Sequence, residues 1–312
     1  MSTSPSASPK SEIPSRYPSR PKISWRIPLA LILVLIALYW AFSGVQFDLH
    51  ELWTGIPKMG DFLQQSMPPD FKSITDPSQY SLPSHLTLKQ LLSPMPLAHG
   101  LNSIRARWWA NTFPNTVVGS TIQTIQMALA GTFLAVLVAL PFSFLAARNT
   151  SPHPVVYHTV KLIVNFLRTI PDFAVGLILI TAIGLGAFTG TMALAFHTST
   201  VLIKLFAEAV EGIDEGVIEA IEATGARYMS IISFAVIPQV MPDFISFILY
   251  RLETNIRAAA VLGLIGAGGI GFIMKSDFSL FNYQEAATTV IVLIVLVMLV
   301  DYTSARLRKL VL

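Results

Sequence analysis

Three arginines lie in or beside long apolar stretches of the sequence, at positions 168, 251 and 257. A charge in such surroundings is costly, so it indicates either a charged partner or a path for a charged molecule. Arg257 follows Glu253 by four residues on one helical face, and the two can neutralise each other. Arg251 has no acidic residue at that spacing, and Arg168 has only Asp172 nearby. Because a guanidinium group binds two oxygens of an oxyanion at once, we treat Arg168, Arg251 and Arg257 as candidates to line an oxyanion path.

Other ionisable side chains favour structural roles. Lys204, Glu208 and Glu211 share one helical face and predict a ladder of ion pairs. His153 and His158 lack the carboxylate or third ligand that a metal site requires. We therefore expect neither a metal site nor a catalytic residue set in this chain.

A glycine-rich run at residues 266–271 has the spacing of a dinucleotide-binding loop. That loop needs a preceding strand, a following helix and an acidic residue about 20 positions further on, whereas this run follows an apolar stretch. The chain also has no Gly-x-x-x-x-Gly-Lys followed by Ser or Thr, the loop that cradles nucleotide phosphates. We expect no nucleotide or other cofactor in this chain, and we expect the glycines of 266–271 to allow tight turns and close helix contact.

A polar segment, 212–238, separates two late apolar stretches. Asp214 can cap a short helix, and Gly225 permits a sharp turn into a second short helix before Pro238. Two short helices at an angle form a compact knob that can lie in a groove of another protein, although an ordinary interfacial helix is the alternative. The residues that carry this hypothesis are Glu219, Ala220, Glu222, Ala223, Gly225 and Pro238.

The composition indicates that much of the chain lies in lipid. Hydrophobic residues make up 53% of it and charged residues only 12%, against roughly a quarter in ordinary soluble domains. The absence of cysteine excludes disulfides, thiol catalysis and cysteine-ligated metal sites. A net charge of +3 is too small to suggest a nucleic-acid partner.

Apolar runs long enough to cross a bilayer predict an all-α membrane protein with about six transmembrane helices. The third run is too long for one straight crossing and contains Pro171, so we expect a break between Arg168 and Asp172. The first run gives one N-terminal helix, and the others give a five-helix core. The six runs are 27–47, 117–146, 155–188, 192–210, 240–262 and 286–300.

Four regions follow along the chain. Residues 1–24 are rich in Ser and Pro and predict a disordered tail. Residues 25–47 form a peripheral transmembrane helix, and residues 48–114 form an external region whose prolines should interrupt any sustained helix. Residues 115–312 form the main transmembrane domain, which includes the 212–238 loop.

Basic residues set the expected orientation. The N-terminal tail, the 148–161 region and the C-terminal tail carry Lys and Arg, which places them in the cytoplasm. Six spans also put both termini on one side of the membrane, which agrees with the cytoplasmic location of both tails. The 212–238 loop should then also be cytoplasmic, although Arg227 is its only basic residue.

Several motifs in the same order resemble the phosphonate-importer permeases and their phosphite and hypophosphite relatives. The 219–225 motif resembles the Glu-Ala-Ala loop of binding-protein-dependent ABC importer permeases, with Ile221 where the second alanine usually lies. The resemblance extends from residue 115 to the C-terminus, and the first hundred residues match only in having one span and a long external loop. The other motifs lie at 167–171, 184–190, 204–208 and 250–263.

The resemblance implies a permease domain that works as a pair in a bacterial inner membrane, as a homodimer. It implies two partner ATPase subunits that bind ATP and Mg and carry out hydrolysis, and an external solute-binding protein. The 212–238 loop would couple the ATPases to alternating access of the spans.

Three other functions remain open on the sequence. A permease for amino acids would have the same coupling loop and would differ from an oxyanion permease only in its substrate. An intramembrane enzyme would need a nucleophile, base or metal ligands converging at one depth. A passive channel would transport without an ATPase partner.

Overall fold

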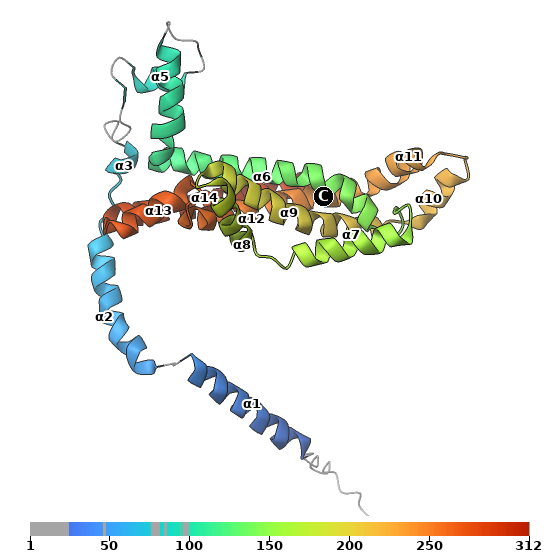
Figure 1. Ribbon diagram of the computed structural model, residues 1–312, viewed down its shortest axis with the longest axis horizontal. Coiled ribbons are helices and arrows are strands. Elements are labelled where there is room, and N and C mark those ends of the chain that lie inside the picture. The colour runs from blue at the N-terminus through green and yellow to red at the C-terminus, as the bar shows by residue number, and fades with distance from the viewer. Residues whose placement is uncertain are drawn as a thin grey trace, which may run out of the picture. The chain divides into compact units, whose positions relative to one another are not determined.

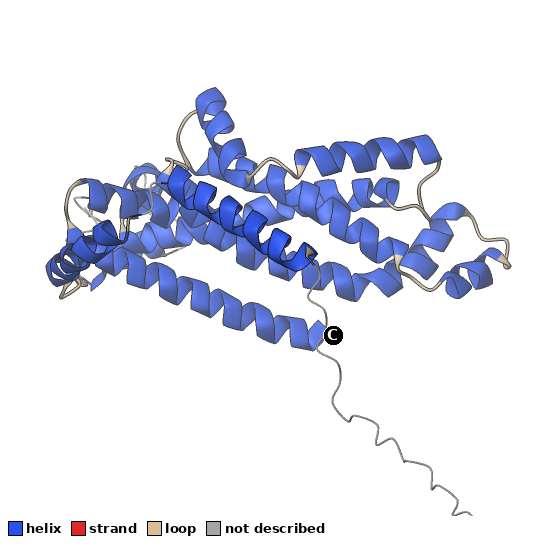
Figure 2. Ribbon diagram, turned by 90° about the horizontal axis from the view of Figure 1, so that it is seen from below, coloured by secondary structure: helices blue, strands red, loops and turns tan. Residues whose placement is uncertain are grey.

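The computed structural model describes residues 25–45, 48–75, 82–83, 86–93, 95 and 100–311. Within these ranges the chain is helical and has no strand (Figure 2), which confirms the predicted all-α class. The chain divides into two units, Met1–Gly60 and Asp61–Leu312. The tail predicted at residues 1–24 lies outside the described residues.

The first unit contains one long apolar helix, α1 (Arg26–Gly44), and most of a second helix. None of the α1 residues is buried. A helix that is apolar on all sides and unburied is suited to lipid, and α1 is long and apolar enough to cross a membrane. This confirms the predicted N-terminal span.

The second helix, α2 (Leu49–Ser66), corrects the expectation that prolines prevent a sustained helix after residue 48. It has 18 residues and contains Pro57 in its interior. Pro57 removes one backbone hydrogen bond, whereas apolar residues recur at helical spacing along the whole segment. The hydrophobic periodicity therefore determines the local structure.

Among the described residues of the rest of the 48–114 region there are three shorter helices, α3 (Lys72–Thr75), α4 (Leu88–Leu92) and α5 (Leu101–Arg107). A π-helical segment (Trp108–Thr112) and a 3-10 turn (Phe113–Asn115) lead from α5 into the long helix that follows. The Trp109 indole Nε1 donates a hydrogen bond of 2.9 Å to the carbonyl of Leu91, which joins the two arms of this segment. It has its own small core of Leu86, Leu91, Trp108 and Phe113.

The membrane helices of the second unit pack side by side (Figure 1). In the described part of the chain, α1 and four helical stretches of this unit are each long and apolar enough to span a membrane, and one bent pair brings the number to six. The pair is α7 and α8, which meet at 83°. The predicted six spans and the break after Arg168 are confirmed. The helices are α6 (Val117–Ala146), α7 (Pro154–Leu167), α8 (Asp172–Ile183), α9 (Ala187–Glu211), α12 (Ile237–Leu264), α13 (Gly269–Ser279) and α14 (Tyr283–Val311).

The glycine run at 266–271 makes the turn between α12 and α13. Gly266, Gly268 and Gly269 have φ angles of +102°, +82° and +70°, which residues with a side chain rarely adopt. A Cβ atom on Gly271 would lie 1.8 Å from the carbonyl oxygen of Ala260, so the two helices meet backbone to backbone. The predicted tight turns and close helix contact are confirmed.

Candidate functional site

The 212–238 segment begins with the predicted knob. After α9 ends at Glu211, the Asp214 carboxylate caps α10 (Glu215–Glu222) by accepting a hydrogen bond of 2.9 Å from the backbone N–H of Gly216. Gly225, with a φ angle of +72°, then turns the chain into α11 (Tyr228–Ile231). Because this backbone conformation strains residues with a Cβ atom, the sharp turn depends on glycine.

The α10 helix is held by one face and exposes the other. Ile218 and Ile221 pack against a buried cluster that includes Phe206, Val210 and Val236. Ile221 is therefore an anchor on the protein side. Five of the six predicted coupling residues are exposed together on this knob, namely Glu219, Ala220, Glu222, Ala223 and Gly225.

The sixth predicted coupling residue, Pro238, is exposed but lies in the first turn of α12 rather than on the knob. The expected end of the second short helix before Pro238 is wrong, because α11 continues without a gap through a π-helical segment (Ile232–Val236) into α12. A π-helical turn accommodates the missing N–H and the ring of a proline. The second arm of the knob is thus one end of a membrane helix.

Hydrogen bonds join the knob and the end of α9 to the loop between α6 and α7. The Tyr228 hydroxyl donates to the carbonyl of Thr150, in the loop between α6 and α7. In the same loop, the Asn149 side chain donates to the carbonyl of Val210 at 2.6 Å. A pattern of helix periodicity cannot reveal these contacts, because the partners lie more than 60 positions apart in the chain.

The predicted ladder of ion pairs is only partly correct. Lys204 pairs with Glu208, with 3.4 Å between Nζ and Oε1. Glu211 instead pairs with Lys161 of α7, also at 3.4 Å, and accepts a hydrogen bond from the backbone N–H of Arg148. The end of α9 is thereby fastened to α7 and to the loop before it.

Arg251, on α12, has an incompletely paired guanidinium group. Its Nη2 atom donates to the hydroxyl of Thr198 on α9 at 3.3 Å. Its Nε atom is buried, and among the described residues it is the one buried side-chain nitrogen or oxygen without a hydrogen-bond partner. A buried donor of this kind needs an explanation, and an acceptor that arrives during function is one.

A buried chain of hydrogen bonds orients Arg251. Thr198 donates to the Asn255 side-chain oxygen at 2.8 Å, and the Asn255 amide nitrogen donates to the Thr132 hydroxyl at 2.8 Å. Asn255 is only 2% exposed, so the chain connects α12, α9 and α6 inside the protein. Sequence reasoning missed these three residues, although Asn255 lies four positions after Arg251 on the same helical face.

The α7–α8 break lies next to this polar chain. His197 of α9 lies with Nδ1 3.1 Å from the carbonyl oxygen of Ile170, in the break itself. The Asp172 carboxylate, at the start of α8, accepts a hydrogen bond of 2.8 Å from the backbone N–H of Phe173. Arg168 is exposed at the other side of the break, and no contact between Arg168 and Arg251 is present among the described residues.

Arg257 differs from Arg251 in its surroundings. Its guanidinium contacts Glu253 at 2.8 Å and Asp301 of α14 at 3.2 Å, and the second oxygen of Glu253 contacts Arg308 at 3.2 Å. The ion pair that the sequence predicts is present and extends into a network of four side chains. This arrangement favours the structural interpretation of Arg257.

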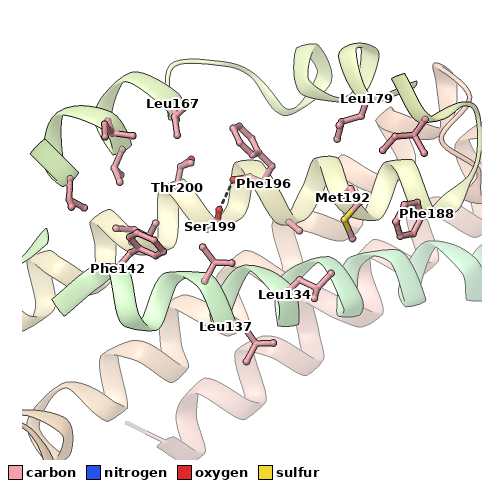
Figure 3. A pocket seen from close by; sticks show the side chains of 17 residues that line it. Leu134, Leu137, Phe142, Leu167, Leu179, Phe188, Met192, Phe196, Ser199 and Thr200 are labelled. Carbon is pink, nitrogen blue, oxygen red and sulfur yellow. Dashed lines mark hydrogen bonds between the residues drawn. The ribbon is translucent and has the colours of Figure 1, made fainter. Parts of the chain in front are cut away.

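A cavity of about 880 Å³ lies between α6, α7, α8 and α9 (Figure 3), and its lining is apolar except for Ser199 and Thr200. Both hydroxyls donate to backbone carbonyls of their own helix at 2.8 Å, and Figure 3 shows the bond from Ser199 to Phe196. The cavity therefore offers no free donor to an anion. The cavity suits apolar chains, and its lining differs in this respect from the polar surroundings of Arg251.

Comparisons with known proteins agree with these features. A family model described as binding-protein-dependent transport system inner membrane component matches residues 139–311. The phosphite transport system permease protein PtxC of Stutzerimonas stutzeri is 34% identical over 281 residues, which cover 90% of this chain and 87% of that protein. The phosphate-import permease protein PhnE of Mycolicibacterium smegmatis is 38% identical over 191 residues, which cover 61% of this chain and 36% of that protein.

The fold also has a solved counterpart. An inward-facing structure of the MetNI methionine ABC transporter matches with a TM-score of 0.56 and 24% identity, over 63% of this chain and 96% of that one. At this identity the match concerns the fold alone. The resemblance read from the sequence motifs is confirmed by the family model and by the extended match to PtxC. The chain therefore belongs to the family of binding-protein-dependent transport system inner membrane components, and it is a permease subunit of an ABC importer.

Proposed function

We propose that this permease carries a phosphorus oxyanion such as phosphite, hypophosphite or a phosphonate. The observation that carries the proposal is the 34% identity to a phosphite permease over 90% of the chain. The buried guanidinium of Arg251 supports it, because its unpaired Nε donor suits an oxygen-rich anion in a site of low dielectric constant. Arg168, exposed beside the break, is the second candidate contact along the path.

ATP hydrolysis is proposed to drive alternating access through the 212–238 loop. The exposed face of α10 would dock in a groove of an ATPase subunit, which binds ATP and Mg. Because α11 continues into α12, a displacement of the knob would reach Arg251 along a single helix of roughly 35 Å. The functional assembly in this proposal contains two identical permease copies, two ATPase subunits and one external solute-binding protein.

The proposed location is a bacterial inner membrane, with both termini and the 212–238 loop in the cytoplasm. The contacts of the segment after α2 support this orientation. The backbone N–H of Asp70 donates to the carbonyl of Gln284, and the Thr288 hydroxyl donates to the carbonyl of Asp70. The segment after the first span thus meets the beginning of the last span, so α14 would cross back to the side from which α1 started.

An amino-acid importer is the runner-up, and the observation in its favour is a 30% identity over 194 residues to a probable D-methionine transport system permease protein of Haemophilus influenzae. That match covers 58% of the chain, less than the match to PtxC does, and at lower identity. An isolated carboxylate-binding arginine would also suit an amino acid. The two functions differ in whether the transported anion carries phosphorus.

Transport by the reconstituted complex tests the proposal. The permease, its ATPase and its solute-binding protein would be placed in proteoliposomes, and uptake of phosphite, hypophosphite, a methylphosphonate and methionine would be compared with and without ATP. We expect ATP-dependent uptake of at least one phosphorus oxyanion and none of methionine. Uptake of methionine alone would contradict the substrate class, and uptake without ATP would indicate a passive channel.

A further inference from the structure

The α2 helix carries a continuous apolar stripe that the described protein leaves uncovered. Its side chains, Trp53, Ile56, Met59 and Leu63, recur every three or four residues and therefore share one face. They are 75%, 58%, 65% and 55% exposed. An exposed stripe of this length on one helix indicates an apolar surface that covers it.

The opposite face of α2 is polar. It presents Thr54, Lys58, Asp61 and Gln65, all of them exposed. Acidic residues on the helix offset its single lysine, so α2 has no basic face to attract anionic lipid. The surface that covers the stripe therefore binds α2 by burying apolar side chains and not by attraction between charges.

The beginning of α2 is tied to a membrane span. Gly44 is the last residue of α1 and Leu49 is the first of α2, so five Cα–Cα steps separate them. Such a connection reaches less than about 18 Å even when fully extended. The first turn of α2 therefore stays close to the bilayer surface at which α1 ends.

The last turns of α2 are also fixed at the end of a span. The ring of Phe62 stacks on Phe278, with 6.2 Å between centroids, and meets the edge of Tyr283 at 5.2 Å. Tyr283 is the first residue of α14. In a helical projection Phe62 lies to the side of the stripe, so this contact leaves the stripe uncovered.

We propose that α2 is an interfacial helix, which lies in the lipid bilayer surface with Trp53, Ile56, Met59 and Leu63 in the boundary between headgroups and acyl chains. Both of its ends are held at the ends of membrane spans, and an amphipathic helix at this depth buries its apolar face in lipid. Trp53 suits this depth, because indole rings gather at the membrane–water interface.

The absence of cysteine allows a direct test. Single substitutions Ile56→Cys, Met59→Cys and Leu63→Cys would each be labelled with a nitroxide in the full chain, in the assembled complex in lipid nanodiscs. Thr54→Cys, Lys58→Cys and Asp61→Cys on the opposite face are the matched controls. Electron paramagnetic resonance would then compare the collision of each label with oxygen, which partitions into lipid, and with a water-soluble nickel chelate.

We expect the ratio of oxygen to nickel accessibility to be at least several-fold higher at the three stripe positions than at the three controls. The ratio should be the same in zwitterionic and in anionic lipid, because the helix binds by apolar area. Nickel access at the stripe would overturn the proposal, as would equal lipid exposure of both faces. Shielding of the stripe from both reagents would also overturn it, by showing that a second copy or another protein covers α2.

Discussion

At the scale of single residues, two arginines of one helix have different surroundings. Arg257 contacts two carboxylates and belongs to an ion-pair network, so its charge is compensated within the protein. Arg251 has one hydrogen bond to a hydroxyl and a buried donor without a partner. A compensated charge holds helices together, whereas an uncompensated donor is available to a ligand. The structure therefore ranks Arg251 above Arg257 as a candidate contact for the proposed oxyanion substrate.

Replacement of Arg251 tests this ranking. Because a hydrogen bond to a charged group contributes about 1.5–3 kcal/mol, Arg251→Met should reduce uptake per assembled complex by roughly 10- to 100-fold. Arg251→Lys keeps the charge but loses the planar fork, and it should retain part of the uptake. Arg306→Met is the matched control, since Arg306 is exposed over the ring of Tyr302 on α14. Unchanged uptake per assembled Arg251→Met complex would remove this residue from the path.

At the scale of elements, the 212–238 loop consists of a helix packed on the protein and the end of a span. The Ile218 and Ile221 side chains hold α10 on the protein, while its glutamates and alanines are exposed. The α11 arm passes without interruption into α12. Gly225 is the hinge between the two arms, and it is the one position in the knob where backbone conformation requires glycine.

A substitution at Gly225 should uncouple the importer without preventing its insertion. Valine at a φ angle of +72° is strained by about 1–2 kcal/mol or more, so Gly225→Val should change the angle between α10 and α11. We expect normal amounts of complex in the membrane, continued ATP hydrolysis and several-fold less uptake per ATP. Gly212→Val is the control, because Gly212 has a φ angle of −92° and a Cβ atom there makes ordinary contacts. Equal ratios of uptake to hydrolysis in the two variants would contradict a coupling role for the turn.

At the scale of the whole molecule, the number and order of spans determine which parts share a side of the membrane. In the proposed topology, six crossings, with α7 and α8 counted as one broken span, would return the chain to the side on which it began. The hydrogen bonds between Asp70 and the first turns of α14 place the segment after α2 beside the start of the last span, as the proposed topology requires.

Reporter fusions test this topology. A reporter fused after Leu312 should be active only in the cytoplasm, and a reporter inserted near Ser81 should be active only outside it. Two reporter enzymes would be used, one that is active only in the cytoplasm and one that is active only outside it. Each would be placed at both positions, and the activity of the four fusions would be measured. The same compartment for both positions would show that the number of spans is wrong, and α1 would be the first helix to reconsider.

The sequence by itself determined the features that depend on local chemistry. Hydropathy located the spans, Pro171 located the break, and Asp214 and Gly225 located the ends of the α10 knob, because lipid solubility, a missing N–H and backbone freedom are properties of the residues themselves. The motifs also identified the family, which the comparisons confirm. The helix α2 follows from the apolar period of its sequence, which persists through Pro57.

Only the tertiary structure decided which side chains meet. The bonds from Thr198 to Asn255 and from Asn255 to Thr132 join helices separated by 57 and 123 positions, and Glu211 reaches Lys161 across 50. Such pairs depend on how helices rotate and pack, and helical periodicity gives a face but not the neighbour that the face meets. The same reason explains why Arg251 and Arg257, which are alike in the sequence, differ in the structure: one faces Thr198 of α9 and the other faces Asp301 of α14.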